Sequence, residues 1–205
     1  MGRVRDGLFR PWTAVLLAGV TAVAGFGLYW FQPWKLWQDE TVREALPGTA
    51  TTAPAAPTAP GATTAPAAPT APGAAPSGSA SAAPPAGPVT LASGELISHE
   101  HATTGTVSLV RLADGSRVVR LEGLDTSNGP DLRVWLTDAP VKEGRAGWHV
   151  FDDGRHVDLG ALKGNKGDQN YTLPEDVDLS AWTSVSIWCD RFDVSFGAAE
   201  LAPTI

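Results

Sequence analysis

The residue with the most distinctive chemistry in this chain of 205 residues is its single cysteine, Cys189. A lone cysteine cannot form a disulfide within its own chain, so its sulfur is a packed apolar group, a reactive thiol or a ligand. A reactive thiol needs a cation, a helix N-terminus or a metal to stabilise the thiolate. Cys189 lies between Trp188 and Asp190, and Arg191 is the one cation near it in sequence. The sequence alone leaves all three roles open.

The residues around Cys189 alternate in polarity, which is typical of a strand with one buried face. The first apolar set comprises Val185, Ile187 and Cys189, and the second comprises Phe192, Val194 and Phe196. The second set is out of phase with the first, and a strand face cannot change parity without a break. We therefore expect a bulge or a tight corner at Asp190–Arg191, with Cys189 facing the core at the end of the first strand.

A haem or metal bound to Cys189 would need a second ligand. The candidates are His99, His101, His149 and His156, with Tyr171 as a further one. The spacing of His99 and His101 matches no zinc motif, and solvent-exposed side chains near a turn explain this pair better. His149 and His156 flank a predicted hairpin and could face each other across its two strands.

The N-terminal part of the chain has the pattern of a membrane anchor. Arg3, Arg5 and Arg10 precede an uncharged, largely apolar run of 18 residues, 14–31. This run is at the lower length limit for a helix that crosses a bilayer, and the arginines before it predict a cytoplasmic N-terminus. We expect a single-pass helix in the cell membrane and an extracytoplasmic C-terminal domain. The alternative is a signal peptide that is cleaved at Ala22–Ala24.

Composition divides the chain into five segments. We expect a cytoplasmic N-terminus (1–13), a transmembrane helix (14–31), a juxtamembrane segment (32–46), a linker (47–88) and a folded domain (89–205). The linker consists almost entirely of Ala, Pro, Thr, Gly and Ser, and residues 51–62 are repeated unchanged as 63–74. Such a segment has too little apolar surface to offset the entropy of ordering. It predicts a disordered stalk between the membrane and the domain.

The pattern of the folded domain predicts an all-β fold. Asp114–Gly115 and Asp152–Gly154 are hairpin signals, Asn128–Pro130 is a turn, and a strand follows at Leu132–Leu136. Residues 160–174, rich in Gly, Asn and Lys, predict a structured loop. The result is an antiparallel β-sandwich. Residues 89–201 carry 10 Lys and Arg against 18 Asp and Glu, and this acidic balance argues against a nucleic-acid partner.

Three spaced motifs of this domain resemble the DM13 domain family. They are Asn128–Leu136, Leu159–Pro174 with Leu162–Asn165, Gly167 and Gln169–Tyr171, and Val185–Leu201. The resemblance covers nearly all of residues 89–201 and implies an extracellular β domain related to DOMON-type sandwiches. It also implies electron transfer through a single cysteine, which acts as a free thiol or holds a prosthetic group such as haem. Cys189 corresponds to that cysteine.

Two functions follow as hypotheses. The first is redox chemistry at Cys189 with a redox partner protein, in a pocket lined by Cys189, Trp188 and the loop 160–167. Tyr171 would lie near this pocket and Asn128–Asp131 at its rim. The second is a binding module for a small ligand, a wall polymer or a partner protein, in which Cys189 is only packed. Both describe an electron-transfer or binding domain rather than an enzyme with its own turnover, and the cofactor, haem included, is left open.

Overall fold

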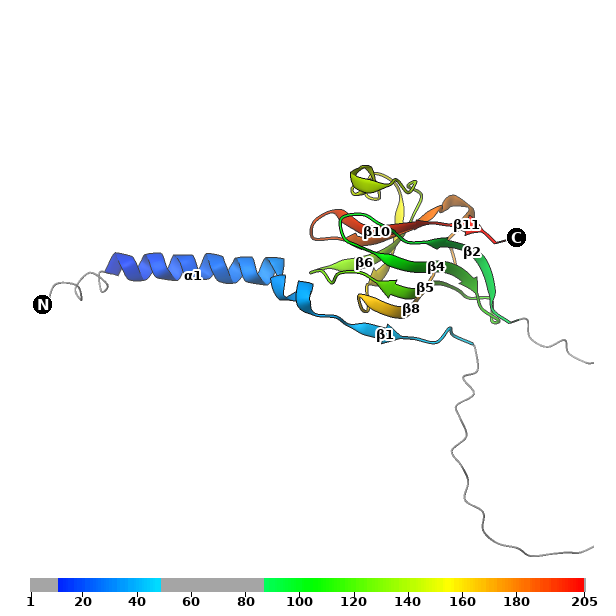
Figure 1. Ribbon diagram of the computed structural model, residues 1–205, viewed down its shortest axis with the longest axis horizontal. Coiled ribbons are helices and arrows are strands. Elements are labelled where there is room, and N and C mark those ends of the chain that lie inside the picture. Colours follow the sequence, from blue (N-terminus) through cyan, green and yellow to red (C-terminus); the bar gives the residue numbers. More distant parts are fainter. Residues whose placement is uncertain (1–10, 49–86, 205) are drawn as a thin grey trace, which may run out of the picture.

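The computed structural model describes residues 11–48 and 87–204 and consists of an N-terminal helix and a mostly β domain of two sheets (Figure 1). Both the apolar helix and the two-sheet, sandwich-like architecture agree with the sequence-based expectations. The expected disorder of the stalk concerns residues 49–86, which lie outside the described residues, as do residues 1–10.

Helix α1 (Pro11–Phe31) is apolar and exposed along its length. Its segment Trp12–Phe31 has a mean hydropathy of 1.8 and is long enough to cross a membrane, although a signal sequence has the same properties. The helix ends where Gln32 adopts the left-handed conformation, with a φ of 42°. Pro33, which lacks a backbone N–H, then opens a short 3-10 helix, η1 (Pro33–Trp37).

The first sheet has six strands and the second has five. In order, the first contains β1 (Thr41–Arg43), β8 (Lys166–Thr172), β5 (Arg117–Asp125), β4 (Thr104–Arg111), β2 (Val89–Glu95) and β11 (Ala202–Pro203). The second contains β3 (Ile97–Ser98), β10 (Val194–Glu200), β9 (Ser184–Cys189), β6 (Leu132–Thr137) and β7 (His156–Ala161). Two short 3-10 helices, η2 (Gly144–Gly147) and η3 (Leu179–Ala181), lie in the connections.

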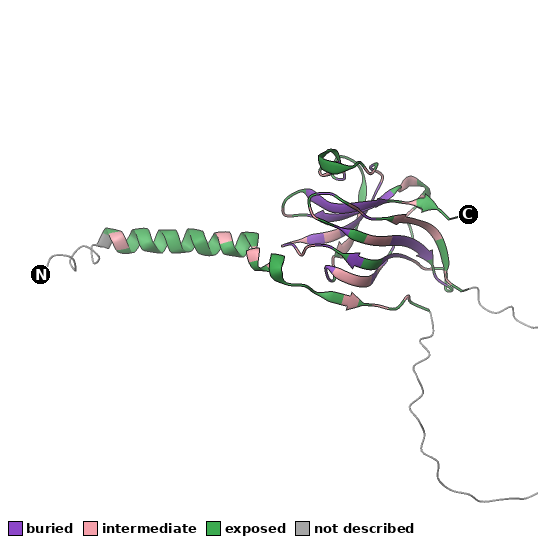
Figure 2. Ribbon diagram, in the orientation of Figure 1, coloured by how far each residue is buried: buried purple, intermediate pink, exposed green. Residues whose placement is uncertain are grey.

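The main core lies between the two sheets, where alternating apolar residues of both face each other (Figure 2). Strand β9 illustrates the pattern, because Val185, Ile187 and Cys189 all point into this core and are 0% exposed. The opposite face of β9 is buried as well. There Trp188 packs with Trp135, Phe151 and two alanines, beneath the long connection between β6 and β7.

The corner predicted at Asp190–Arg191 is a complete hairpin turn that joins β9 to the antiparallel β10. The backbone N–H of Phe192 donates to the carbonyl of Cys189 at 3.2 Å, and Asp193 adopts a φ of 50°. A further irregularity in the pairing falls between Ser195 and Gly197. The phase shift in the sequence therefore marks the point where the chain reverses direction.

Strand β1 lies within residues 32–46 and pairs in parallel with β8, so that it forms the edge of the first sheet, a pairing that the sequence-based division did not anticipate. Lys166 N donates to Glu40 O at 3.1 Å, and Glu44 N donates to Asp168 O at 3.0 Å. The side chain of Asn165, 1% exposed, accepts from Glu40 N at 2.7 Å and donates to Asp39 Oδ1 at 2.8 Å. The chain thus contacts the domain before residues 49–86 begin.

The pairing of β1 fixes where the described chain leaves and rejoins the domain. Residues 49–86 lie in the sequence between β1, at one edge of the first sheet, and β2, near the other edge. Figure 1 shows that β1 runs from the α1 end of the domain towards the opposite end, where the described chain breaks off and resumes. The spacing between helix and domain is therefore set by the few residues of η1 and the segment before β1.

Two local predictions for the domain were wrong. Residues 160–174, expected as a loop, contain the end of β7 and all of β8. Backbone pairing with β5 holds β8 in the sheet despite its polar composition. The hairpin expected around Asp152–Gly154 has a strand only on its C-terminal side, β7, while Trp148–Phe151 is irregular and covers Trp188. His149 and His156 therefore do not face each other across two strands.

Candidate functional site

Cys189 is the last residue of β9 and is enclosed on both sides by paired strands. Its register partners are Leu132 of β6 and Val194 of β10. Its side chain is 0% exposed and belongs to the core between the sheets. A sulfur in this position has no open path to solvent.

The thiol of Cys189 lies in an environment with two opposing effects. Burial raises its pKa above the ordinary value, and this effect dominates. Hydrogen bonds from the backbone N–H groups of Phe192, Arg191 and Asp131 act in the opposite direction, because they stabilise the thiolate. Because burial dominates, the thiol stays protonated at neutral pH in the closed hairpin.

Trp188, expected beside Cys189 in one pocket, points to the opposite face of β9. Its ring stacks on Trp135 with centroids 4.8 Å apart and meets Phe151 edge-on at 6.5 Å. The indole nitrogens of both tryptophans are buried without a hydrogen-bond partner among the described residues. Trp188 is thus part of the outer packing layer and cannot line the same cavity as the sulfur.

Tyr171, the third expected site residue, lies on β8 in the first sheet and contributes to the same core as Cys189. Its hydroxyl donates to Gln169 Oε1 at 2.8 Å and accepts from Lys163 N at 3.0 Å. Burial raises the pKa of Tyr171 to about 12. These bonds hold the turn between β7 and β8 in place, which is a positioning role.

The histidines are engaged in contacts of their own. His99, expected at the surface, is buried, with Nδ1 2.8 Å from Ser195 Oγ and Nε2 3.0 Å from Lys142 O, and burial lowers its pKa. His149 Nδ1 lies 2.6 Å from Asp193 O, and His156 stacks on Trp135 at 3.8 Å. His101 pairs with Glu100, Nε2 to Oε2 at 2.6 Å.

A haem or metal on Cys189 does not fit this arrangement. The sulfur is enclosed, and both ring nitrogens of His99 are bonded elsewhere. Within residues 11–48 and 87–204, no three His, Cys, Asp or Glu side chains are grouped so that they could hold a metal ion. The packing therefore supplies neither space nor a second ligand for such a group at Cys189.

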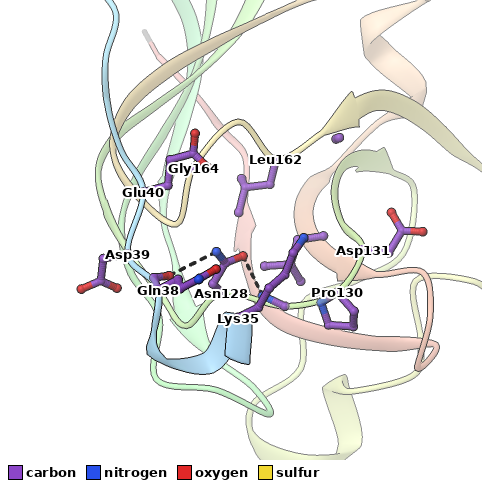
Figure 3. A pocket seen from close by; sticks show the side chains of 12 residues that line it. Lys35, Gln38, Asp39, Glu40, Asn128, Pro130, Asp131, Leu162 and Gly164 are labelled. Atoms are coloured by element: carbon purple, nitrogen blue, oxygen red, sulfur yellow. Dashed lines mark hydrogen bonds between the residues drawn. The ribbon is translucent and has the colours of Figure 1, made fainter. Parts of the chain in front are cut away.

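A polar cavity of 540 Å³ opens beside the turn before β6 (Figure 3). It is lined by Asn128–Leu132, by Ala161, Leu162 and Gly164, and by Lys35 and Gln38–Glu40. Asn128 Nδ2 donates to Gln38 O at 3.2 Å, while its Oδ1 accepts from Gly129 N at 2.8 Å. The sequence pointed to the first two groups, whereas no sequence signal indicated that the juxtamembrane residues complete the wall.

An apolar cavity of 330 Å³ lies next to the polar one and shares Lys35, Gly129 and Pro130 with it. The rest of its wall consists of Phe31, Gln32, Pro33, Leu36, Glu100, His101, Phe192, Val194 and Phe196. Neither cavity is lined by Cys189, Trp188 or Tyr171. Leu132 and Val194, the two strand partners of Cys189, each line one of the cavities, so the sulfur lies behind the wall of both.

The hairpin after Cys189 touches the C-terminal end of α1. Arg191 Nη1 donates to Trp30 O at 2.7 Å, and its guanidinium carbon lies 4.8 Å from the centre of the Trp30 ring. Phe192 stacks on Phe31 with ring centroids 5.8 Å apart. The end of the domain that carries Cys189 is therefore the end that faces the helix.

The two packed sheets define a β-sandwich-like domain, and its single cysteine is buried in the core between them. The sequence model of the family described as Electron transfer DM13 matches residues 95–201, and the chain belongs to the DM13 family. The match excludes residues 31–40, some of which line each of the two cavities. Comparison with the curated proteins and with the solved structures found no match.

Proposed function

We propose that this chain is a membrane-anchored electron-transfer protein whose DM13 domain is held at the outer surface of the membrane, with Cys189 as the redox residue. Support comes above all from the contact between Arg191, in the hairpin after Cys189, and Trp30, near the end of α1. If α1 spans the membrane, this contact places the Cys189 end of the domain beside the bilayer. The family membership supplies the electron-transfer class.

The residues that cleavage would leave at the new N-terminus favour anchoring by α1 over removal of a signal peptide. A cut at Ala22–Ala24 would expose an apolar N-terminal segment to water, with Phe26, Tyr29 and Phe31 between 56% and 71% exposed. In a bilayer these side chains would lie in hydrocarbon or at the interface. The arginines at positions 3, 5 and 10 favour an N-terminus in the cytoplasm.

The redox role of Cys189 requires the hairpin 190–193 to open, because the closed hairpin buries the sulfur and raises its pKa. The three backbone N–H groups around the sulfur would stabilise a thiolate once water or a partner relieves the desolvation. A short turn with one left-handed residue is a small unit that can open without the strands separating.

A binding module is the second candidate, and the burial of Cys189 favours it. A thiol packed at 0% exposure behaves as a small apolar side chain. The two cavities on the helix side of the domain then become the functional features, for a small ligand, a wall polymer or a partner protein.

Thiol reactivity and visible absorbance of the purified full chain in detergent separate the two functions. The electron-transfer proposal expects slow reaction of Cys189 with a thiol reagent under native conditions, because the hairpin must open to expose the sulfur. A colourless protein whose thiol reacts only after unfolding would reject the redox role and leave the binding module. Protease added to intact cells tests the anchor, since it should remove the domain and leave a membrane-bound stub, whereas a mature protein that begins at Gly25 would refute the anchor.

A further inference from the structure

We propose that the apolar cavity binds the ring of a membrane quinone, an inference that rests on the proposed function because it requires α1 to anchor this end of the domain in the bilayer. A quinone is a planar ring with carbonyl oxygens and an apolar isoprenoid tail. The position of the cavity suits the apolar tail, its aromatic lining suits the ring, and its polar groups suit the carbonyl oxygens.

The position of the cavity places it within reach of ligands dissolved in the membrane. Phe31, the last residue of α1, Leu36 of η1 and Phe192 of the Cys189 hairpin all line it. The tryptophans that surround the helix end, Trp30 and Trp34, are each 44% exposed, as expected of side chains at a membrane interface. A ligand whose tail stays among the lipids can therefore place its ring in this cavity.

The lining suits a flat apolar ring. Four aromatic groups contribute, since Phe31 stacks on Phe192 at 5.8 Å and the ring of His101 lies 4.0 Å from that of Phe196. Aromatic side chains bind planar rings by offset stacking or edge contacts. A volume of 330 Å³ is in the range of sites for small ligands, which begin at about 300 Å³.

The polar groups in the wall distinguish a quinone from a lipid acyl chain. Glu100 Oε2 lies 2.6 Å from His101 Nε2, and His101 Nδ1 has no hydrogen-bond partner among the described residues. A protonated imidazole paired with a carboxylate can donate to a quinone carbonyl from its other nitrogen, and a neutral one can accept there from the hydroxyl of the reduced quinol. An acyl chain has no group that could use either bond. The same carboxylate disfavours an anionic headgroup at this point.

The quinone would lie one residue away from the candidate redox site. Val194, which lines the cavity, is the strand partner of Cys189, and the backbone N–H of Phe192, also in the wall, donates to the carbonyl of Cys189 at 3.2 Å. The cavity therefore joins the membrane phase to the part of the domain where electron transfer is proposed. We assign binding to this site, which stands independently of the chemistry at the sulfur.

The test is calorimetric titration of the full chain in detergent with a methylnaphthoquinone that carries one isoprene unit. We expect saturable binding at one site per chain. His101→Ala should weaken it about tenfold, which corresponds to the loss of one hydrogen bond. Leu36→Trp should abolish it, because the indole fills the cavity. His156→Ala, a histidine outside the cavity, should bind as the wild type does.

Three results would overturn the inference. The first is the absence of saturable binding, and the second is equal affinity in Leu36→Trp and wild type. The third is competitive displacement of the quinone by a short-chain phosphatidylglycerol at equal concentration, which would identify a general lipid site. If a variant fails to fold, photolabelling of the wild-type protein with an azido derivative of the same quinone replaces the variant as the test. Labelling within residues 31–36 or 192–196 supports the site, and labelling confined to other segments contradicts it.

Failure of this inference is distinguishable from failure of the proposed function. If quinone does not bind but the protease experiment leaves an intact membrane stub, the quinone inference is wrong and the proposal of an anchored redox protein stands. A mature protein that starts at Gly25 removes the anchor, and the quinone inference falls with it.

Discussion

Glu44 and Lys163 are 119 residues apart in the chain and form an ion pair, with Lys163 Nζ 2.7 Å from Glu44 Oε1. The same carboxylate accepts from the backbone N–H of Asn170 at 2.8 Å. These contacts fasten the residue after β1 to the turn between β7 and β8 and to β8 itself. The helix side of the chain is thereby tied directly to the domain.

The docking of β1 should weaken in acid. Burial raises the pKa of Glu44, but the hydrogen bonds from Lys163 and Asn170 outweigh it and hold the pKa below the ordinary value of 4.5. A lowered pKa means that the ionised group stabilises the docked state above pH 4.5, and this contribution is lost as the pH falls through the folded-state pKa. The NMR signal of the Val42 amide should report this loss.

Glu44→Gln is the matching control for the acid effect. It keeps the shape of the side chain and should weaken docking by about 1 kcal/mol at neutral pH, with little further change in acid. An identical pH profile in Glu44→Gln and wild type would assign the acid effect to another group.

Gly167→Ala should release β1. Gly167 has a φ of 93°, and a Cβ there would collide with the carbonyl oxygen of Val42. Gly160 has a φ of 114° but no heavy atom within 4 Å of such a Cβ, so Gly160→Ala is a matched control for backbone strain. Both variants should lose about 1–2 kcal/mol of stability from strain, but only Gly167→Ala should become sensitive to protease at residues 38–46. Equal protease sensitivity in the two variants would show that β1 is not held at Gly167.

Arg191→Ala should loosen the contact between α1 and the domain without unfolding the domain. It removes the hydrogen bond to Trp30 O and the contact with the Trp30 ring, and an exposed contact of this kind contributes about 0.5–1 kcal/mol. Arg145→Ala removes a similar contact, 5.1 Å from the centre of the Trp148 ring, at a distance from the helix. In vesicles, protease should cut the segment 32–38 faster in Arg191→Ala than in Arg145→Ala. Equal rates would contradict the contact.

Cys189→Ser should destabilise the domain by about 1–3 kcal/mol, because it places a hydroxyl in apolar surroundings. Urea denaturation measures this change, and an unchanged midpoint would indicate an exposed side chain. Since the pKa of Cys189 is raised, the buried thiol stabilises the fold below the unfolded-state value of 9.0. That contribution should be lost as the pH rises from this value through the folded-state pKa.

The part of the fold that the sequence predicted is the part with strong local patterns. The alternation of Val185, Ile187 and Cys189 predicted that the thiol faces the core, and the phase shift after Arg191 predicted the turn between β9 and β10. The spaced motifs gave the family, which the match over residues 95–201 confirms.

The remaining features depend on contacts between distant segments. Strand β1 has three residues with no apolar alternation, and its pairing with β8 is set by Asn165 and Glu44 rather than by local preference. Strand β8 contains Gly, Asp, Gln and Asn, which disfavour isolated strands, and β5 beside it supplies the missing stability. The two cavities exist only because residues 31–40 return to the domain, so no local signal could reveal them.

Voltammetry of the full chain in a supported bilayer tests the electron-transfer role of Cys189 most directly. The wild type should give an oxidation wave in which Cys189 loses an electron to the electrode and its proton to water, and Cys189→Ala should lose this wave. Ser186→Ala should keep it, because Ser186 is an equally buried residue on the opposite face of the same strand. The same wave in Cys189→Ala, or no wave in the wild type, would contradict the redox role of Cys189.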